Sequence, residues 1–160
     1  MRGSESTNGR SDHDAIGARL HELAGGCHCQ AIGVRYRTRF PVGVLHVGRC
    51  GCSFCRRHGA RTSADVGGTL EIMERLPGAE RYRFGLKTAD FLICRGCGVY
   101  VAAVIRIGGV DFATLNVNVL DDRDAFDPAP PIFHYDNETD AERIARRRQR
   151  WTPTTLLKAD

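Results

Sequence analysis

The sequence predicts a mainly β domain, built mostly of antiparallel strands with few short helices. From Ala31 onward, short apolar and β-branched runs are separated by Gly, Pro and Asp. Several of these runs alternate apolar and polar residues with period two, as half-buried antiparallel strands do. Only one segment, near the C-terminus, has a clear helical pattern.

The expected strands follow one another along the chain. The segment ARLHEL (18–23) is expected to form a short helical turn or an early strand. The main strand candidates cover residues 31–37, 42–47, 69–74, 80–85, 89–94, 98–106 and 110–119. The segment GVYVAAVIR (98–106) is apolar on both faces, so we expect a central strand there. After Leu120 the chain is rich in proline, which excludes a central strand.

The C-terminal part contains the predicted helix. The run ETDAERIARRRQR (138–150) has acidic residues early and arginines late, which suits the helix macrodipole. We expect its arginine-rich part, 143–150, to be a solvent-exposed helix face. The chain would then consist of a flexible leader (1–17), a β domain (18–136) and a C-terminal helix and tail (137–160) that pack on the domain or extend from it.

Length and charge limit the class of protein. The 160 residues suffice for one domain with its own core. The net charge of +4 suits an anionic ligand but is too weak to indicate nucleic acid. The longest apolar run (99–105) is too short to cross a bilayer, and the N-terminal segment lacks the apolar region of a secretory signal. We therefore expect a cytoplasmic protein without a membrane partner.

The seven cysteines fall into three clusters. An odd number in a reducing compartment favours metal binding or thiol chemistry over disulfides. The segment CRGCG (94–98) has the form of a zinc knuckle, since two intervening residues let both thiolates reach one ion at about 2.3 Å. A thioredoxin-type redox pair is the alternative, but its βαβ pattern is absent. Cys27 and Cys29 would complete a closed site of four cysteines, for which zinc is expected over iron.

The remaining cysteines, Cys50, Cys52 and Cys55, lie within six residues. Three thiolates are one ligand short of a closed tetrahedral site. They could be free buried thiols, or a histidine could complete the site. The candidate histidines are His46, His58 and His134. We prefer a zinc ion with three thiolates and one open position, because an open position distinguishes catalytic from structural zinc.

Three segments, GGCHCQAIGVRY, CGCSFCRRHGA and FLICRGCGV, resemble the glutathione-dependent formaldehyde-activating enzyme family, which includes centromere protein V-like proteins. The pattern is C-x-C, then C-x-C-x-x-C, then C-x-x-C-G, and the resemblance covers residues 20–136. It implies a β-tent fold of antiparallel sheets with zinc knuckles, and two zinc ions per chain, one structural and one catalytic. Their implied ligands are Cys27, Cys29, Cys94 and Cys97 for the first ion and Cys50, Cys52 and Cys55 for the second.

One position departs from the family pattern. Many relatives have a histidine between the first two cysteines of the middle cluster, where this chain has Gly51. That histidine is not a required ligand, so we expect the metal site to be retained. The exchange for glycine removes a proton carrier or hydrogen-bond donor.

An open position on a thiolate-rich zinc ion favours a fourth sulfur ligand. The resemblance implies the same chemistry, with glutathione or its adducts as substrates. Because glutathione carries two carboxylates, the basic residues after the cluster, Arg56, Arg57 and His58, are candidates for substrate binding. The two arginines could instead only balance the thiolate charge.

Two functions remain in consideration. The first is a zinc-dependent carbon–sulfur lyase or synthase acting on thiol adducts of small aldehydes or electrophiles, with the middle cluster (Cys50, Cys52 and Cys55) as the catalytic site. The second is a non-catalytic zinc-stapled β module that binds a protein or nucleic acid, suggested by the centromere protein V-like members and the basic helix. We prefer the enzyme, because a pure binding module has no need for an incomplete metal site.

Overall fold

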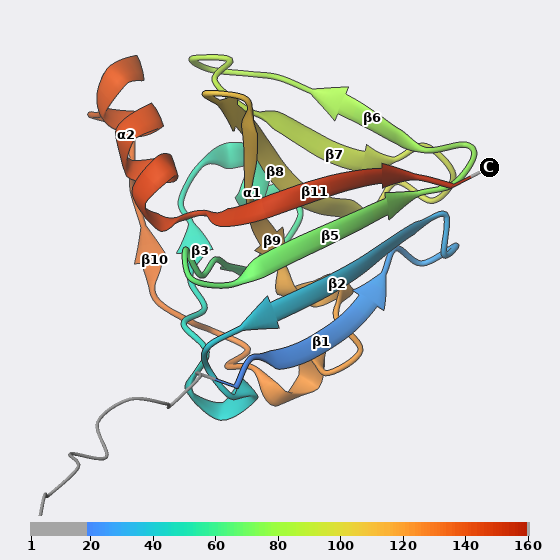
Figure 1. Ribbon diagram of the computed structural model, residues 1–160. Coiled ribbons are helices and arrows are strands. Elements are labelled where there is room, and N and C mark those ends of the chain that lie inside the picture. Colours follow the sequence, from blue (N-terminus) through green and yellow to red (C-terminus); the bar gives the residue numbers. More distant parts are fainter. Residues whose placement is uncertain (1–18, 160) are drawn as a thin grey trace, which may run out of the picture.

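The computed structural model of the chain describes residues 19–159 (Figure 1), so the leader expected at 1–17 lies outside the described residues. Within this range the chain forms eleven strands, two α-helices and three 3₁₀ turns, which confirms the mainly β prediction. Neither helix in the described range has the length and apolar character needed to span a membrane.

Most strands join one large sheet, in the order β1-β2-β5-β11-β9-β8-β7-β6, with β4 paired to β9. The strands are β1 (His21–Gly26), β2 (Ile32–Thr38), β3 (Arg49–Cys50), β4 (Thr62–Ser63), β5 (Thr69–Glu74), β6 (Ala79–Tyr82), β7 (Asp90–Cys94), β8 (Tyr100–Ile107), β9 (Val110–Asn116), β10 (Ile132–Phe133) and β11 (Thr152–Lys158). The sheet is mixed rather than purely antiparallel, because β11 runs parallel to β5 and antiparallel to β9.

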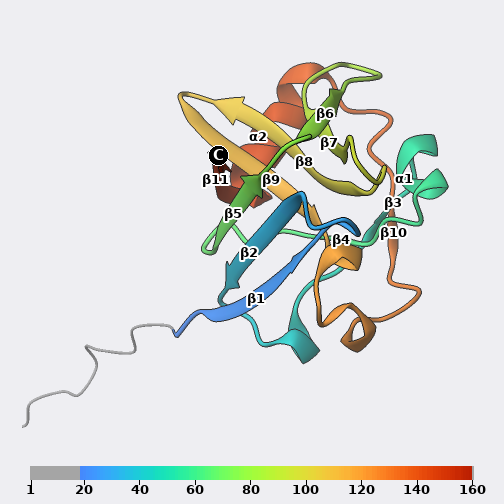
Figure 2. The same ribbon diagram turned by 90° about the vertical axis from the view of Figure 1, so that its right-hand side faces the viewer.

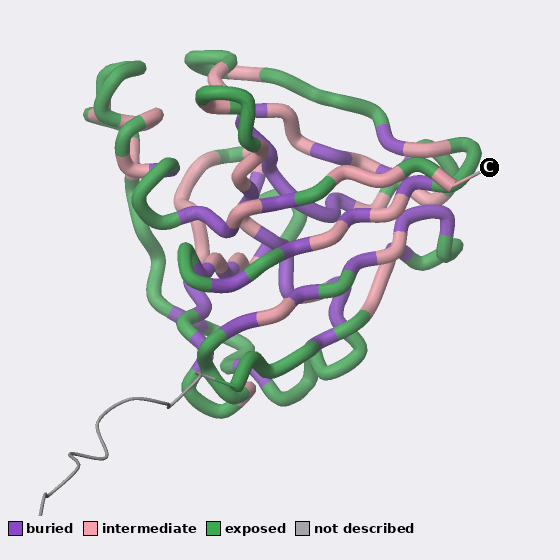
Figure 3. The backbone as a smooth tube through the Cα atoms, viewed as in Figure 1, coloured by how far each residue is buried: buried purple, intermediate pink, exposed green. Residues whose placement is uncertain are grey.

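The core lies within this sheet. Along β2, the side chains of Ile32, Val34 and Tyr36 are buried, as the period-two pattern predicts. In β8 every residue from Tyr100 to Ile105 is buried, which confirms the prediction of a central strand (Figure 3). One face of β8 packs into the main core, and the other is covered by Trp151 and by helix α2 (Asp140–Arg150).

Helix α2 begins where the sequence predicts. Thr139 caps it: the Glu142 N–H donates to Thr139 Oγ1 at 3.3 Å, and the Thr139 N–H donates to Glu142 Oε2 at 2.8 Å. This reciprocal capping box satisfies two backbone donors that the first turn leaves free. The helix packs over β8 and β9 (Figure 2). It ends at Trp151, after which the chain continues at once into β11.

Several elements differ from the sequence prediction, or settle an alternative that it left open. The strand expected at 42–47 is instead a 3₁₀ turn (Val42–Val44) followed by irregular chain, and β9 gives way to a 3₁₀ turn at Val117–Val119. The ambiguous segment 18–23 supplies the start of β1. Strand β11 was not expected; its Pro153 stands near the start of the strand, where a missing N–H is tolerated.

A two-residue parallel pairing organises the region of the middle cysteine cluster. Strand β10 lies beside β3, with Ile132 opposite Arg49 and Phe133 opposite Cys50. The Gly51 N–H continues the ladder by donating to Phe133 O at 2.8 Å. The proline-rich segment therefore reaches the cysteines without entering the large sheet.

Gly25 provides a test of how β1 is placed. A Cβ atom on Gly25 would lie 2.1 Å from Val119 O and 2.7 Å from Leu120 Cα, both backbone atoms that cannot yield easily. We expect Gly25→Ala to lower the free energy of unfolding by about 2 kcal/mol, as overpacking does. Urea denaturation measures this change.

The matched control is Gly33→Ala in the neighbouring strand β2, where the nearest atoms to an added Cβ are 4.0 Å away. We expect its effect to stay within about 0.5 kcal/mol. Equal stability of the two variants would contradict the close approach of β1 to residues 119–120.

Candidate metal centres and the adjoining cavity

The first candidate metal centre joins two turns that are distant in sequence. The Sγ atoms of Cys27, Cys29, Cys94 and Cys97 all lie within 4.8 Å of one another. Cys29 Sγ is 3.7 Å from Cys27 Sγ and 3.5 Å from Cys94 Sγ. Four thiolates around a tetrahedral zinc ion with bonds of about 2.3 Å would be separated by about 3.8 Å. The donor set therefore fits zinc with little movement.

Backbone groups prepare this cluster for a cation. The Ile32 N–H donates to Cys27 Sγ at 3.2 Å, and Gly98 takes the positive φ of 76° that the turn after Cys97 requires. Burial raises the pKa of Cys94 to about 12. Burial also raises the pKa of Cys97, but hydrogen bonds, first those from backbone N–H groups, outweigh it and lower the value to about 6. Thiolates this close repel one another, so only a cation among them stabilises all four.

The second candidate centre is built by β3 and the short helix α1 (Ser53–Arg57). Cys50 ends β3, Cys52 caps α1, and Cys55 lies within α1, so that the three Sγ atoms lie within 4.8 Å of one another. The Cys55 N–H donates to Cys52 Sγ at 3.4 Å. Within residues 19–159, no histidine or carboxylate ligand atom joins this group. Three thiols are thus its donor set in the described part of the chain.

The three thiols differ in their ease of ionisation. Hydrogen bonds from Cys50 and then Cys55 to the Cys52 sulfur lower the pKa of Cys52 to about 2. The hydrogen bond with Cys52, and then burial, raise the pKa of Cys50, and hydrogen bonds with Cys50 and Cys52 raise that of Cys55. Cys52, at the N-terminus of α1 and half-buried, is therefore the thiol that ionises first.

None of the candidate histidines is a ligand in this arrangement. His58 ends α1 and lies against Phe54, with ring centroids 4.5 Å apart. His46 is exposed, with its ring 6.0 Å from that of Phe133. His134 lies over Gly51: a Cβ on Gly51 would be 2.4 Å from His134 Cε1 and Nδ1. An imidazole therefore stands beside position 51 after all, supplied by the residue that follows β10.

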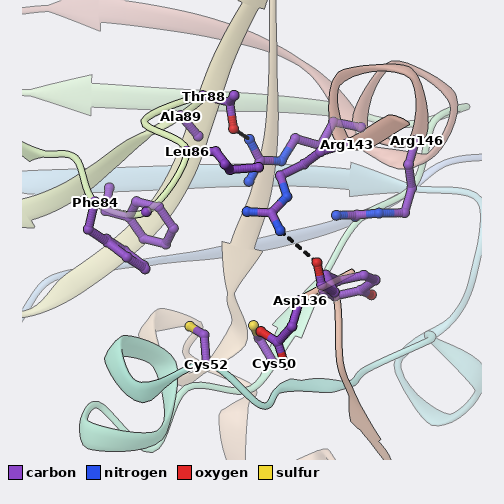
Figure 4. A pocket seen from close by; sticks show the side chains of 13 residues that line it. Cys50, Cys52, Phe84, Leu86, Thr88, Ala89, Asp136, Arg143 and Arg146 are labelled. Carbon is purple, nitrogen blue, oxygen red and sulfur yellow. Dashed lines mark hydrogen bonds between the residues drawn. The ribbon is translucent and has the colours of Figure 1, made fainter. Parts of the chain in front are cut away.

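A cavity of about 300 Å³ adjoins the three-thiol cluster (Figure 4). Cys50 and Cys52 lie on one side, and Arg143 and Arg146 reach towards it from α2 on the other. Phe84, Leu86 and Phe91 form an apolar wall, and Tyr135 and Asp136 also line the space. The cavity thus combines thiols, cationic groups and apolar surface.

The arginines of α2 do not form the solvent-exposed face that the sequence predicted. Arg147 is buried and Arg143 and Arg146 are half-buried, whereas Arg148 and Arg150 are exposed. Residues 143, 146 and 147 have the i, i+3, i+4 spacing that places them on one face of the helix. That face packs over β8 and the cavity, which is why part of the prediction for 143–150 is wrong.

The three arginines differ in their ion-pair and hydrogen-bond partners. Arg143 Nε lies 3.3 Å from Glu138 Oε2, and Arg146 Nη2 lies 2.9 Å from the same oxygen. Arg147 Nη1 donates to Thr88 Oγ1 at 2.6 Å, and its guanidinium lies 4.6 Å from the ring centroid of Trp151. Arg147 Nε is buried and has no hydrogen-bond partner among the described residues. Burial, and then the nearby Arg146 and Arg143, lower the pKa of Arg147 to about 10.

Comparison with known proteins agrees with the cysteine pattern. Residues 22–136 match the family described as glutathione-dependent formaldehyde-activating enzyme. The chain belongs to this family. A crystal structure of a Rhodobacter sphaeroides protein is similar, with 31% sequence identity and a TM-score of 0.51, over 69% of this chain and 99% of that one. No curated protein matches.

The family match ends before α2, so the arginines of the cavity lie outside the matched segment. The predicted substrate-binding residues Arg56, Arg57 and His58 are exposed at the end of α1 and do not line the cavity. Their role remains a prediction. Sequence reasoning missed the three arginines of α2; the available signal was their spacing on one helix face.

The contact between His134 and Gly51 can be tested directly. We expect Gly51→Ala to displace the His134 side chain, which is exposed and free to move, at a cost below about 1 kcal/mol in unfolding free energy. The His134 imidazole signals in a ¹H–¹³C NMR spectrum should shift. Gly43→Ala, where an added Cβ meets nothing within 4 Å, should leave them in place. Unchanged signals in Gly51→Ala would refute the contact.

Proposed function

We propose that this member of the glutathione-dependent formaldehyde-activating enzyme family is a zinc-dependent carbon–sulfur lyase or synthase. Its substrates would be adducts of glutathione, or a similar thiol, with small aldehydes or other electrophiles. The observation that carries the proposal is that Cys50 and Cys52 of an incomplete thiol cluster line a cavity that also contains arginines.

The two clusters would have separate roles. We assign a structural zinc ion to Cys27, Cys29, Cys94 and Cys97, because four thiols complete a tetrahedral site. We assign a catalytic zinc ion to Cys50, Cys52 and Cys55, where three thiols leave one position for a ligand from the cavity. Zinc in that place would act as a Lewis acid that lowers the pKa of a bound thiol.

The reaction needs no oxidant or reductant. In the synthase direction, the substrate sulfur forms a bond to the carbonyl carbon of the aldehyde, and the thiol proton ends on the carbonyl oxygen. The lyase direction breaks the same carbon–sulfur bond and returns the proton to sulfur. The residues of the chain would hold the substrate thiol at the cluster. Phe84 and Phe91 would exclude water from the cavity, and the arginines would balance the negative charge of the substrate and the thiolates.

A thiol substrate also suits the state of the cysteines. All seven are free. We propose that the protein works in a reducing compartment such as the cytoplasm, where thiols persist. The alternative of a nucleic-acid or protein-binding module has weaker support, because three of the arginines that would form its basic surface turn towards the cavity.

The activity of a variant without the Cys52 thiol tests the assignment of the middle cluster as the catalytic site. We expect Cys52→Ala to reduce the exchange between formaldehyde, glutathione and their adduct to the uncatalysed background, as measured by NMR exchange spectroscopy. Far-UV circular dichroism should remain unchanged, because Cys52 lies outside the strands of the large sheet. Ser53→Ala, at the exposed neighbouring residue, should retain full activity. Catalysis that persists in Cys52→Ala would sink the proposal.

Release of zinc distinguishes the two proposed sites. We expect a chromogenic chelator to remove one ion quickly and with the β structure retained, because three thiolates beside a cavity hold it less tightly than four. Glutathione should slow this first phase by supplying a fourth sulfur. Loss of the second ion should unfold the domain, since structural zinc contributes on the order of 10 kcal/mol to folding. Equal release rates, unaffected by glutathione, would mean that the middle site is closed.

A further inference from the structure

We propose, building on the function above, that α2 gives the cavity an anion-binding site in which Arg147, with Arg143 and Arg146, binds a carboxylate of the thiol substrate. The enzyme would then select anionic thiol adducts over neutral ones. The three arginines lie outside the segment that matches the family, so this selectivity would be a property of the C-terminal part of this chain.

Arg147 is buried and carries hydrogen-bond donors without an anionic partner among the described residues. Its side chain is buried, with 7% of the residue exposed, and it lines the cavity. Its one hydrogen bond to another side chain joins Nη1 to a neutral hydroxyl, that of Thr88, and Nε has no partner among the described residues. A buried guanidinium with unused donors is costly unless an anion binds it. A substrate carboxylate can accept two parallel hydrogen bonds from such a group.

The charged groups around the cavity are unevenly distributed. Glu138 is the carboxylate partner of both Arg143 and Arg146. Asp136 is the acidic residue that lines the cavity together with the three arginines, and it is exposed. Three cationic groups therefore face two carboxylates, one of them largely in water. A zinc ion with three thiolates would add a net charge of −1 on the thiol side of the cavity, so the positive charge is local to the α2 side, where it suits an anion.

The shape of the cavity allows one molecule to reach both the thiols and the arginines. The arginines and the thiols lie on facing sides of one cavity of about 300 Å³, which is at the lower end of the range for small-molecule sites (Figure 4). A second, smaller space of about 100 Å³, which shares lining residues with the first, is lined by Cys50, Cys55 and Arg147 together. A single small molecule can therefore place its sulfur at the cluster and a carboxylate at Arg147. Phe84 and Leu86 face its carbon chain.

A simpler role for Arg147 is to offset the charge of the thiolates without touching substrate. That role predicts no preference for a ligand with free carboxylates. It also predicts that loss of Arg147 weakens the binding of neutral and of anionic ligands equally. The two roles can therefore be separated by comparing ligands that differ only in their carboxylates.

The test uses S-methylglutathione and its diethyl ester as probes, titrated into the zinc-loaded full-length protein by isothermal titration calorimetry. The methylated sulfur cannot ionise, so the carboxylate contribution is measured apart from thiol chemistry. We expect the free acid to bind about 10- to 100-fold more tightly than the ester, the effect of a charge-assisted hydrogen bond. Arg147→Met should abolish this preference. Arg148→Met, an equal change of charge at the exposed neighbouring residue, should retain it.

Arg146→Gln provides a second variant if Arg147→Met does not fold, because Arg146 borders the same cavity and is half-buried. The preference of the Arg146→Gln variant for the free acid over the ester should fall several-fold. Equal affinity of the unaltered protein for acid and ester, no binding of the acid, a preference that survives in Arg147→Met, or an undiminished preference in Arg146→Gln would overturn the proposal. The exchange activity of Cys52→Ala is a separate measurement, so failure of the anion site and failure of the proposed enzyme function are distinguishable.

Discussion

The contact between the two turns that carry the four-thiol cluster is the constraint on which the rest of the fold depends. In the order of strands, β1 and β2 stand at one end of the sheet, while β7 and β8 stand near the other, which ends with β6. Yet Cys29 Sγ and Cys94 Sγ lie 3.5 Å apart. A sheet whose opposite ends meet must curl, and the curl encloses the core built by both sets of strands. A metal ion bound by these thiols would hold the curl closed.

The cavity depends on a different set of contacts, between segments that no single sheet unites. The β10–β3 pairing brings the segment after β10 to the three thiols, so that Tyr135 and Asp136 line the cavity. Arg143 Nη2 then donates to Tyr135 O at 2.6 Å, and Arg146 lies 3.8 Å from the ring centroid of Tyr135. These contacts connect α2 to β10 and β10 to β3. The charged groups thereby face one another across a partly enclosed space, where their interaction is screened less than in water.

Much of the candidate site could be predicted from the sequence, because cysteine spacing is a local property. Two residues between Cys94 and Cys97 suffice for both thiols to reach one ion, whatever surrounds them. Periodicity likewise predicted β5 at 69–74, and the apolar character of both faces of residues 98–106 predicted the central position of β8. The apolar segment at 42–47 has a similar composition but finds no strand partner, and it forms a turn instead. Composition alone does not distinguish these outcomes, because pairing depends on the tertiary fold.

The direction in which the α2 arginines point could not be predicted from the local sequence, for the same reason. A run of arginines near the end of a helix normally faces water, and nothing within 143–150 shows which face will pack. The orientation of α2 is set by β11, which enters the sheet between β5 and β9. Trp151 joins the two elements: its N–H donates to Arg147 O at 2.7 Å, and the next residue begins β11. Helix α2 therefore cannot turn away from the cavity without unpairing a central strand. Side chains on so constrained a helix are held in place before any substrate arrives, which is the condition under which fixed charges contribute most to binding and catalysis.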